Sequence, residues 1–136
     1  MSAFRGARIE HIQINVTDLD RARRFYGGLL ALEEVPRPDS FDFAGAWYRI
    51  GAVDLHLVVR DREPGSERHF CFWVADVREA AATLEAGGQP IAWQLALKIP
   101  GVDRFFVCDP DDNRIEVQGP DGTGQSRWET ITASLV

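Results

Sequence analysis

The chain is poor in the features that mark nucleic-acid-binding, secreted and membrane-spanning proteins. Its only lysine is Lys98, and 15 basic residues face 21 acidic ones, for a formal net charge of -6. Because phosphate binding needs clustered basic side chains, we expect no nucleic-acid partner. No apolar run approaches the roughly 20 residues that span a bilayer, and the first residues lack a signal-peptide core. We therefore expect a cytoplasmic protein without a membrane partner.

Cysteine and histidine are scarce as well. The two cysteines, Cys71 and Cys108, form no CxxC motif and lie in strand-like segments, so we expect reduced thiols and no disulfide. The remaining composition is ordinary for a folded protein, with 45% hydrophobic and 26% charged residues. At 136 residues, the chain is expected to form one domain, residues 1–136.

An internal repeat organises the sequence. Residues 11–22 align with residues 69–80 at a constant offset of 58, and His, Val, Asp and Ala coincide in the two copies. Each copy begins with alternating apolar residues, which predicts a strand, and continues with an Asp that is suited to cap a helix, Asp18 or Asp76. Both helices are predicted to end at a glycine pair, residues 27–28 or 87–88, although the first could continue through Leu29 and Leu30.

Further strands are predicted after each helix, separated by turn residues. They cover about residues 31–35, 43–50 and 53–59 in the first copy, and 90–95, 103–108 and 114–118 in the second. Residues 109–113, Asp-Pro-Asp-Asp-Asn, predict a tight hairpin. The fold class is therefore α+β, with two βαβββ repeats, about 8–60 and 66–118, forming curved mixed sheets around a metal-containing cavity. Residues 119–136 form a tail without a predicted role.

The closing strands of the two repeats also align, and this alignment exposes a candidate metal site. An offset of 60 places His56 over Glu116, while His11 already lies over His69, so all 3 histidines fall on repeat-equivalent strand positions. Each of the four side chains has the opposite strand parity to its apolar neighbours, which predicts that all four point away from the helices. Three imidazoles and one carboxylate suit Zn, Ni, Fe, Mn or Co.

Alternatives stay open for these residues. A single strand histidine is more often a hydrogen-bonded structural residue than a ligand, and Glu116 alone would be a surface charge. His56 is the weakest member of the set, because it could be an acid-base group while His11, His69 and Glu116 hold the ion. Neighbours of the same parity are expected to line the cavity and suggest a small, partly aromatic or polar substrate: Gln13, Asn15, Cys71 and Trp73. Trp47 and Lys98 could close its rim, although core packing and solvent exposure are favoured.

These stretches resemble the vicinal oxygen chelate superfamily, which comprises glyoxalases, bleomycin-resistance proteins and dioxygenases. The resemblance rests on residues 11–22 with Phe25 and Tyr26, on residues 69–77, and on residues 105–116. It implies a divalent ion that binds vicinal oxygens of a small substrate and stabilises an enediolate or oxyanion. Glu116 matches the last ligand of the family. Two positions depart from its pattern: His56 stands where isomerases usually carry Glu or Gln, and Asp112 replaces a turn glycine.

The resemblance favours a metal-dependent lyase or isomerase of the glyoxalase type, with Glu116 and His56 as candidate catalytic residues. An extradiol-type dioxygenase using Fe(II), or a metal-free drug binder as in bleomycin resistance, are alternatives. A fosfomycin-resistance-like enzyme would need a cationic subsite, and the sequence shows no clear cluster of basic residues with the cavity parity. Arg114 shares parity with Glu116 and could serve, although a strand-end arginine is more often a surface residue. Exposed strand edges and the habits of relatives predict a homodimer.

Overall fold

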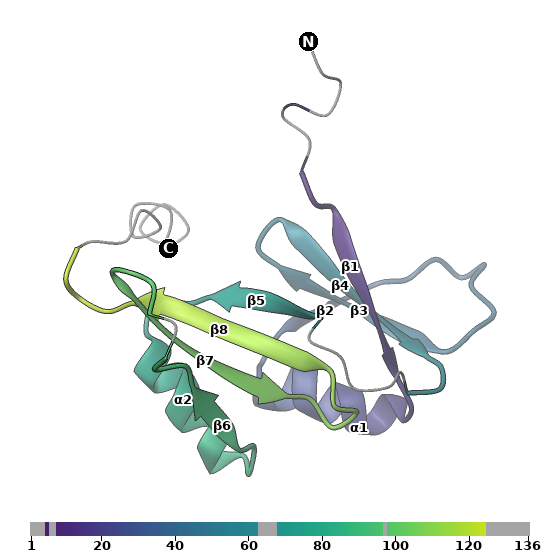
Figure 1. Cartoon of the computed structure of the whole chain (residues 1–136). Helices are drawn as coiled ribbons and strands as arrows, with labels where there is room; N and C mark the ends of the chain where they lie inside the picture. The colour runs from purple at the N-terminus through teal and green to yellow at the C-terminus, as the bar shows by residue number, and fades with distance from the viewer. Residues whose placement is uncertain (1–4, 6–7, 63–67, 97, 125–136) are drawn as a thin grey trace. The chain divides into compact units, whose positions relative to one another are not determined.

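The computed structural model describes residues 5, 8–62, 68–96 and 98–124. The chain divides into two compact units, one within residues 1–63 and one within residues 64–136. Each unit contains a strand, a helical segment and three further strands, which pair into one four-stranded mixed sheet (Figure 1). The predicted α+β fold of two βαβββ repeats is therefore confirmed.

Unit 1 is built around the sheet order β1-β4-β3-β2. Its first and last strands run parallel side by side, and the other neighbours are antiparallel. The elements are β1 (His11–Val16), α1 (Leu19–Arg23), a π-helix (Arg24–Leu29), β2 (Glu33–Val35), β3 (Gly45–Ile50) and β4 (Val53–Val59). Predicted strands and observed strands agree within two residues at each end, which is the usual uncertainty of strand termini.

The first helical segment passes through the glycine pair instead of ending there. Asp18 caps α1 by accepting a hydrogen bond from the Arg21 backbone amide at 2.9 Å. The π-helix then continues to Leu29, as the longer of the two sequence alternatives predicted. Gly27 fits because a Cβ at this position would lie 3.1 Å from the Tyr48 hydroxyl, so the small residue lets the helix approach the buried tyrosine closely.

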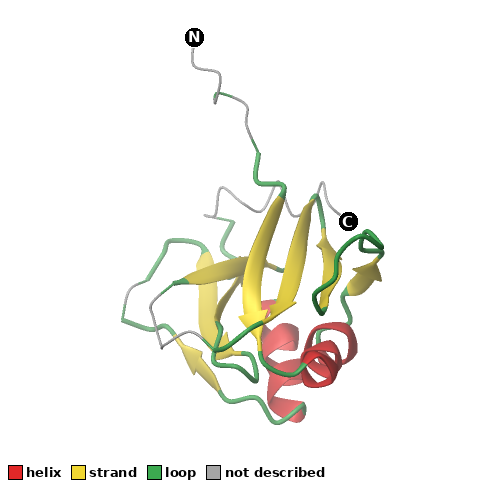
Figure 2. Ribbon diagram, turned by 90° about the vertical axis from the view of Figure 1, so that its right-hand side faces the viewer, coloured by secondary structure: helices red, strands yellow, loops and turns green. Residues whose placement is uncertain are grey.

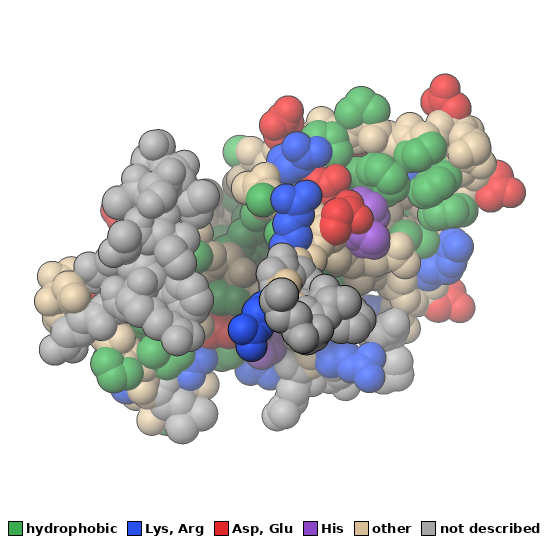
Figure 3. Space-filling model, turned by 90° about the horizontal axis from the view of Figure 1, so that it is seen from above, with side chains coloured by type: hydrophobic (Ala, Val, Ile, Leu, Met, Phe, Trp, Pro, Cys, Tyr) green, Lys and Arg blue, Asp and Glu red, His purple; other side chains and the backbone are tan. Residues whose placement is uncertain are grey.

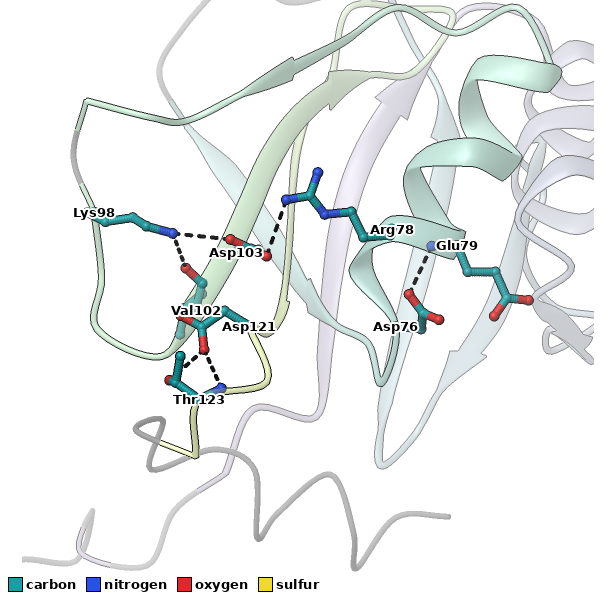
Figure 4. Close-up of polar contacts among 8 residues, drawn as sticks. All are labelled: Asp76, Arg78, Glu79, Lys98, Val102, Asp103, Asp121 and Thr123. Atoms are coloured by element: carbon teal, nitrogen blue, oxygen red, sulfur yellow. Dashed lines mark hydrogen bonds and ion pairs between the residues drawn. The ribbon is translucent and has the colours of Figure 1, made fainter.

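Unit 2 repeats this plan with the order β5-β8-β7-β6. Its elements are β5 (His69–Trp73), α2 (Val77–Ala86), β6 (Ile91–Trp93), β7 (Val102–Cys108) and β8 (Arg114–Pro120). Asp76 caps α2 by accepting from the Glu79 amide at 3.0 Å (Figure 4). The helix ends at Gly87, as predicted, and Gly88 takes φ +81, a value that glycine adopts without strain.

The hairpin between β7 and β8 is organised by Asp109, which is buried. Its Oδ1 accepts from the backbone amides of Asp111 and Asn113, both at 2.8 Å, and its Oδ2 accepts from the Asn113 side chain at 2.7 Å. Asp112 takes φ +63, a left-handed conformation that Asp tolerates better than most residues. Strand β8 continues through Pro120, so the predicted tail begins two residues too early, and its residues 125–136 lie outside the described part of the chain.

Each helix packs on one face of the sheet of its own unit (Figure 2). Strand register places the predicted ligands on the other face. In unit 1 the buried side chains include Leu55, Leu57 and Tyr48, and in unit 2 they include Phe105 and Ile115. Every one of these has the parity opposite to the histidines. Within the described residues, no helix is long and apolar enough to cross a membrane.

Candidate functional site

Strand register places the predicted ligands at equivalent points of the two sheets. In unit 1, Gln13 of β1 lies opposite His56 of β4, and His11 is two residues earlier on β1. In unit 2, Cys71 of β5 lies opposite Glu116 of β8, and the residue two earlier is the third histidine, His69. The two parallel strand pairs therefore have the same register, as the sequence alignment of the repeats requires.

In unit 1, the structure brings His11 and His56 together as a stacked pair. Their ring centroids are 4.2 Å apart and the rings are nearly parallel, at 13°. The opposite face of the His56 ring lies flat on Trp47, with centroids 3.9 Å apart and an angle of 4°. Trp47, expected at the cavity rim or in the core, is thus a direct neighbour of a candidate site residue. His56 is enclosed between the two rings.

The buried imidazole of His56 has an unpartnered nitrogen. Only 9% of its side chain is exposed, and its Nε2 makes no hydrogen bond, with the Asp54 Oδ2 4.0 Å away. Burial disfavours the charged ring and lowers the pKa of His56, and the nearby His11 ring adds to this effect, while Asp54 and Glu10 oppose it. His56 is therefore a neutral imidazole with a free ring nitrogen at ordinary pH.

His11 is more exposed and is oriented by its sequence neighbour. Its Nδ1 lies 2.9 Å from Glu10 Oε2, so a proton on Nδ1 is donated to the carboxylate and the Nε2 lone pair is left for a ligand. Metal-binding histidines commonly hold their second nitrogen in this way. A surface view shows a histidine side chain beside acidic side chains (Figure 3).

In unit 2, the structure brings His69 and Glu116 together. His69 Nε2 lies 3.0 Å from Glu116 Oε2. The other carboxylate oxygen, Oε1, accepts hydrogen bonds from Arg104 Nη1 and from Gln118 Nε2, both at 2.8 Å. Burial alone would raise the pKa of Glu116, but the bonds from Gln118, Arg104 and His69 and the Arg104 charge together lower it. Glu116 is thus held as a carboxylate with one oxygen directed at His69.

The donor types of this pair suit a divalent transition metal, because imidazole nitrogen and carboxylate oxygen are common ligands of such ions. His69 Nε2 and Glu116 Oε2 lie 3.0 Å apart, a hydrogen-bond distance that brings the two candidate ligands together. Within the described residues, no group of three or more His, Cys, Asp or Glu side chains is placed to hold an ion. That the pairs from the two units share one ion stays a prediction.

The stacking in unit 1 bears on whether His56 can bind the same metal ion as His11. An ion bound to an imidazole nitrogen at about 2.1 Å lies close to the ring plane. Two nearly parallel planes with centroids 4.2 Å apart share no such point, so His11 and His56 do not both ligate one ion in the observed arrangement. This geometry does not support His11 and His56 as two ligands of the same ion.

Two contributors to the site were not anticipated, namely Arg104 and Gln118. Both have the strand parity of Glu116, which was the available signal, and Gln118 is two residues further along β8. Another neighbour, Cys71, was expected: burial and the Glu116 charge raise the pKa of its thiol to about 12, although part of the residue is exposed. Lys98 is not at this face, because it pairs with Asp103 at 3.1 Å together with Arg78 of α2, on the helix side (Figure 4).

Comparison with known proteins agrees with the fold. The Glyoxalase/Bleomycin resistance protein/Dioxygenase superfamily matches residues 8–117, and the chain belongs to this family. The Arabidopsis thaliana protein "Glyoxylase I 4" is 27% identical over 122 residues, which are 80% of this chain and 68% of the relative.

Solved structures also resemble this chain in fold. A protein from Bacillus anthracis assigned to the glyoxalase family has a TM-score of 0.77 and 30% identity, covering 84% of this chain and 95% of its own. A mutant of the fosfomycin resistance protein FosX from Listeria monocytogenes, complexed with Mn(II) and 1S,2S-dihydroxypropylphosphonic acid, has a TM-score of 0.74 and 16% identity. It covers 85% of this chain and 94% of its own, and shows likeness of fold.

Proposed function

We propose that this protein is a metal-dependent lyase or isomerase of the glyoxalase type that acts on a small substrate with vicinal oxygens. The observation that carries the proposal is the His69 and Glu116 pair, whose facing atoms are separated by 3.0 Å. Because Arg104 and Gln118 occupy Oε1, only Oε2 of Glu116 is directed at the histidine. Such an outer shell is typical of carboxylates that bind metal through one oxygen.

We assign His11, His69 and Glu116 as ligands of a divalent ion, Zn, Ni, Fe, Mn or Co, with His56 as the alternative fourth ligand. When bound, the ion supplies Lewis acidity to the vicinal oxygens of the substrate. The histidine and carboxylate donors suit this group of metals rather than Ca, which prefers all-oxygen shells. The Mn(II) complex of the FosX relative supports a divalent ion in this family.

His56 is the residue we assign to proton transfer. A general base must be unprotonated and must have a free lone pair within reach of the substrate proton. The lowered pKa of His56 satisfies the first condition, and its Nε2 makes no hydrogen bond that would hold the ring nitrogen in another role. Glu116 is a weaker base, since two hydrogen bonds and the Arg104 charge stabilise its ionised form. His56 would accept a proton from the carbon beside a carbonyl, and Trp47 would hold its ring in place.

Turnover assays separate this proposal from its competitors. The metal-loaded protein is expected to convert the hemithioacetal of methylglyoxal and glutathione. His56→Gln is expected to retain the metal but to lower kcat by about 100-fold, which is the usual contribution of a general base. Trp93→Phe serves as a control outside the site. Oxygen uptake with catechols instead would indicate a dioxygenase. A metal-free protein that binds a bleomycin-type drug without turnover would indicate a binder, and either result would reject the proposal.

The small-molecule substrate, the homodimer and the cytoplasmic location remain predictions. We propose a homodimer because each unit leaves two strands at the ends of its own sheet, β1 and β2 or β5 and β6, and such edges are common sites of pairing. Light scattering is expected to give twice the mass of one 15.2 kDa chain. A mass near one chain would reject the dimer.

A further inference from the structure

A cleft in unit 2 lies next to the His69 and Glu116 pair. Its volume is about 550 Å³, within the range of small-molecule sites. Phe106 connects the two places, because its ring contacts His69 edge to face, with centroids 5.4 Å apart, and also lines the cleft. The cleft is formed entirely by residues of β6, β7, β8 and their connections, so it belongs to this unit alone.

Arg114 is the basic residue that lines the cleft, and it is not paired with a carboxylate of the described residues. Its guanidinium carbon lies 4.1 Å from the centre of the Phe106 ring. Other arginines of this acidic chain are paired with carboxylates, among them Arg49 with Asp54 and Arg104 with Glu116. Stacking on an aromatic ring orders a guanidinium while leaving its N–H donors available, which favours recognition of an anion.

The carboxylates of the cleft do not cancel this cation. Asp109 is buried, and both of its oxygens accept hydrogen bonds within the hairpin, as described above. Asp112 also lines the cleft, but its side chain is exposed, where water and salt screen its charge. The remaining wall is largely apolar, with Pro90, Ile91 and Ala92.

We propose that this cleft is an anion subsite, in which Arg114 binds a carboxylate carried by the substrate. The inference rests on the proposed function, since it places the reacting oxygens of the substrate at His69 and Glu116. Arg114 and Glu116 are two residues apart on one face of β8, which separates their backbone positions by roughly 7 Å. The substrate class is therefore a small organic acid with vicinal oxygens at one end, an apolar body, and a carboxylate at the other end.

Titration of the ¹⁵N-labelled, metal-free full chain with 3-phenylpropionate tests the subsite, and the uncharged 3-phenylpropanamide is the matched probe. The carboxylate is expected to shift the Arg114 side-chain signal and the backbone amide signals of Phe106 and Cys108. It should bind about tenfold more tightly than the amide, the usual advantage of a charged hydrogen-bonding partner. Arg114→Met should remove that advantage, Arg114→Lys should retain part of it, and Arg78→Met on the helix side should retain all of it.

Equal binding of the two probes, or unchanged binding in a folded Arg114→Met variant, would overturn the subsite. His69→Ala is expected to leave probe binding intact, because the titration needs no metal. If His69→Ala abolished binding, the anion would lie on the histidine and the assignment to Arg114 would be wrong. Failure of the metal-dependent function would leave these titrations unchanged, so the two proposals fail separately.

Discussion

Arg104 donates a 2.8 Å hydrogen bond to Glu116; Glu116 is buried, with 6% of its side chain exposed, and Arg104 is largely covered, with 13% exposed. The pair fixes which carboxylate oxygen faces His69. It also makes the face of the sheet that carries the predicted ligands polar at its centre. Removing one member of such a pair leaves a buried charge without its main partner, which is more damaging than losing a surface ion pair.

Replacing Arg104 by Met is therefore expected to lower the free energy of unfolding by about 3 kcal/mol. Arg78→Met is the matched control, because Arg78 is 70% exposed and its contact with Asp103 is 3.5 Å; a loss under about 0.5 kcal/mol is expected. Urea unfolding measures both. Equal losses in the two variants would show that the Arg104 contact has no special role.

The same substitution should change how stability depends on pH. The pKa of Glu116 is lowered in the folded protein, so its contribution to stability is present above the unfolded value of 4.5 and is lost as pH falls through the folded pKa. Without Arg104, burial is expected to dominate and the pKa of Glu116 should rise. Carbon-detected NMR titration of the carboxyl group measures this change, and an unchanged pKa in Arg104→Met would contradict the assignment of its cause.

His56 should also destabilise the fold as pH falls, in a pH window just below 6.5. Burial lowers its pKa below 6.5, so between the folded pKa and 6.5 the unfolded chain binds more protons, and stability falls as pH drops through that window. Trp47→Leu uncovers one face of the ring and is expected to move the pKa of His56 back toward 6.5. Phe41→Leu, which changes a ring that contacts Trp47 but not His56, should move it less. NMR titration of the histidine signals decides between these results.

The Asp109 hairpin predicts a separate stability effect. Asp109→Ala leaves two backbone amides without their acceptor and should lower the free energy of unfolding by about 2–3 kcal/mol. Asp112→Asn should change it by less than about 0.5 kcal/mol, since Asn adopts positive φ as readily as Asp. Thermal unfolding of the two variants gives the comparison. A similar melting temperature for both would argue against Asp109 as the organiser of the turn.

Strand parity and the repeat offsets predicted the strands, the helix caps and the face on which the histidines lie. These features depend on local sequence, where side chains alternate with a period of two. The stack of His56 between His11 and Trp47, and the partners of Glu116, depend on how neighbouring strands are registered and on which rotamers pack. Arg104 is on β7 and Glu116 is on β8, twelve residues apart, and parity alone did not distinguish Arg104 from a surface arginine.

The most direct test of the central claim is metal analysis of protein purified without chelator. The account predicts one transition-metal ion per chain, loss of that ion in His69→Ala and in Glu116→Gln, and retention in Cys71→Ser, which alters the neighbouring side chain opposite Glu116. A wild-type protein without metal, or a His69→Ala variant that is folded and still fully loaded, would contradict it.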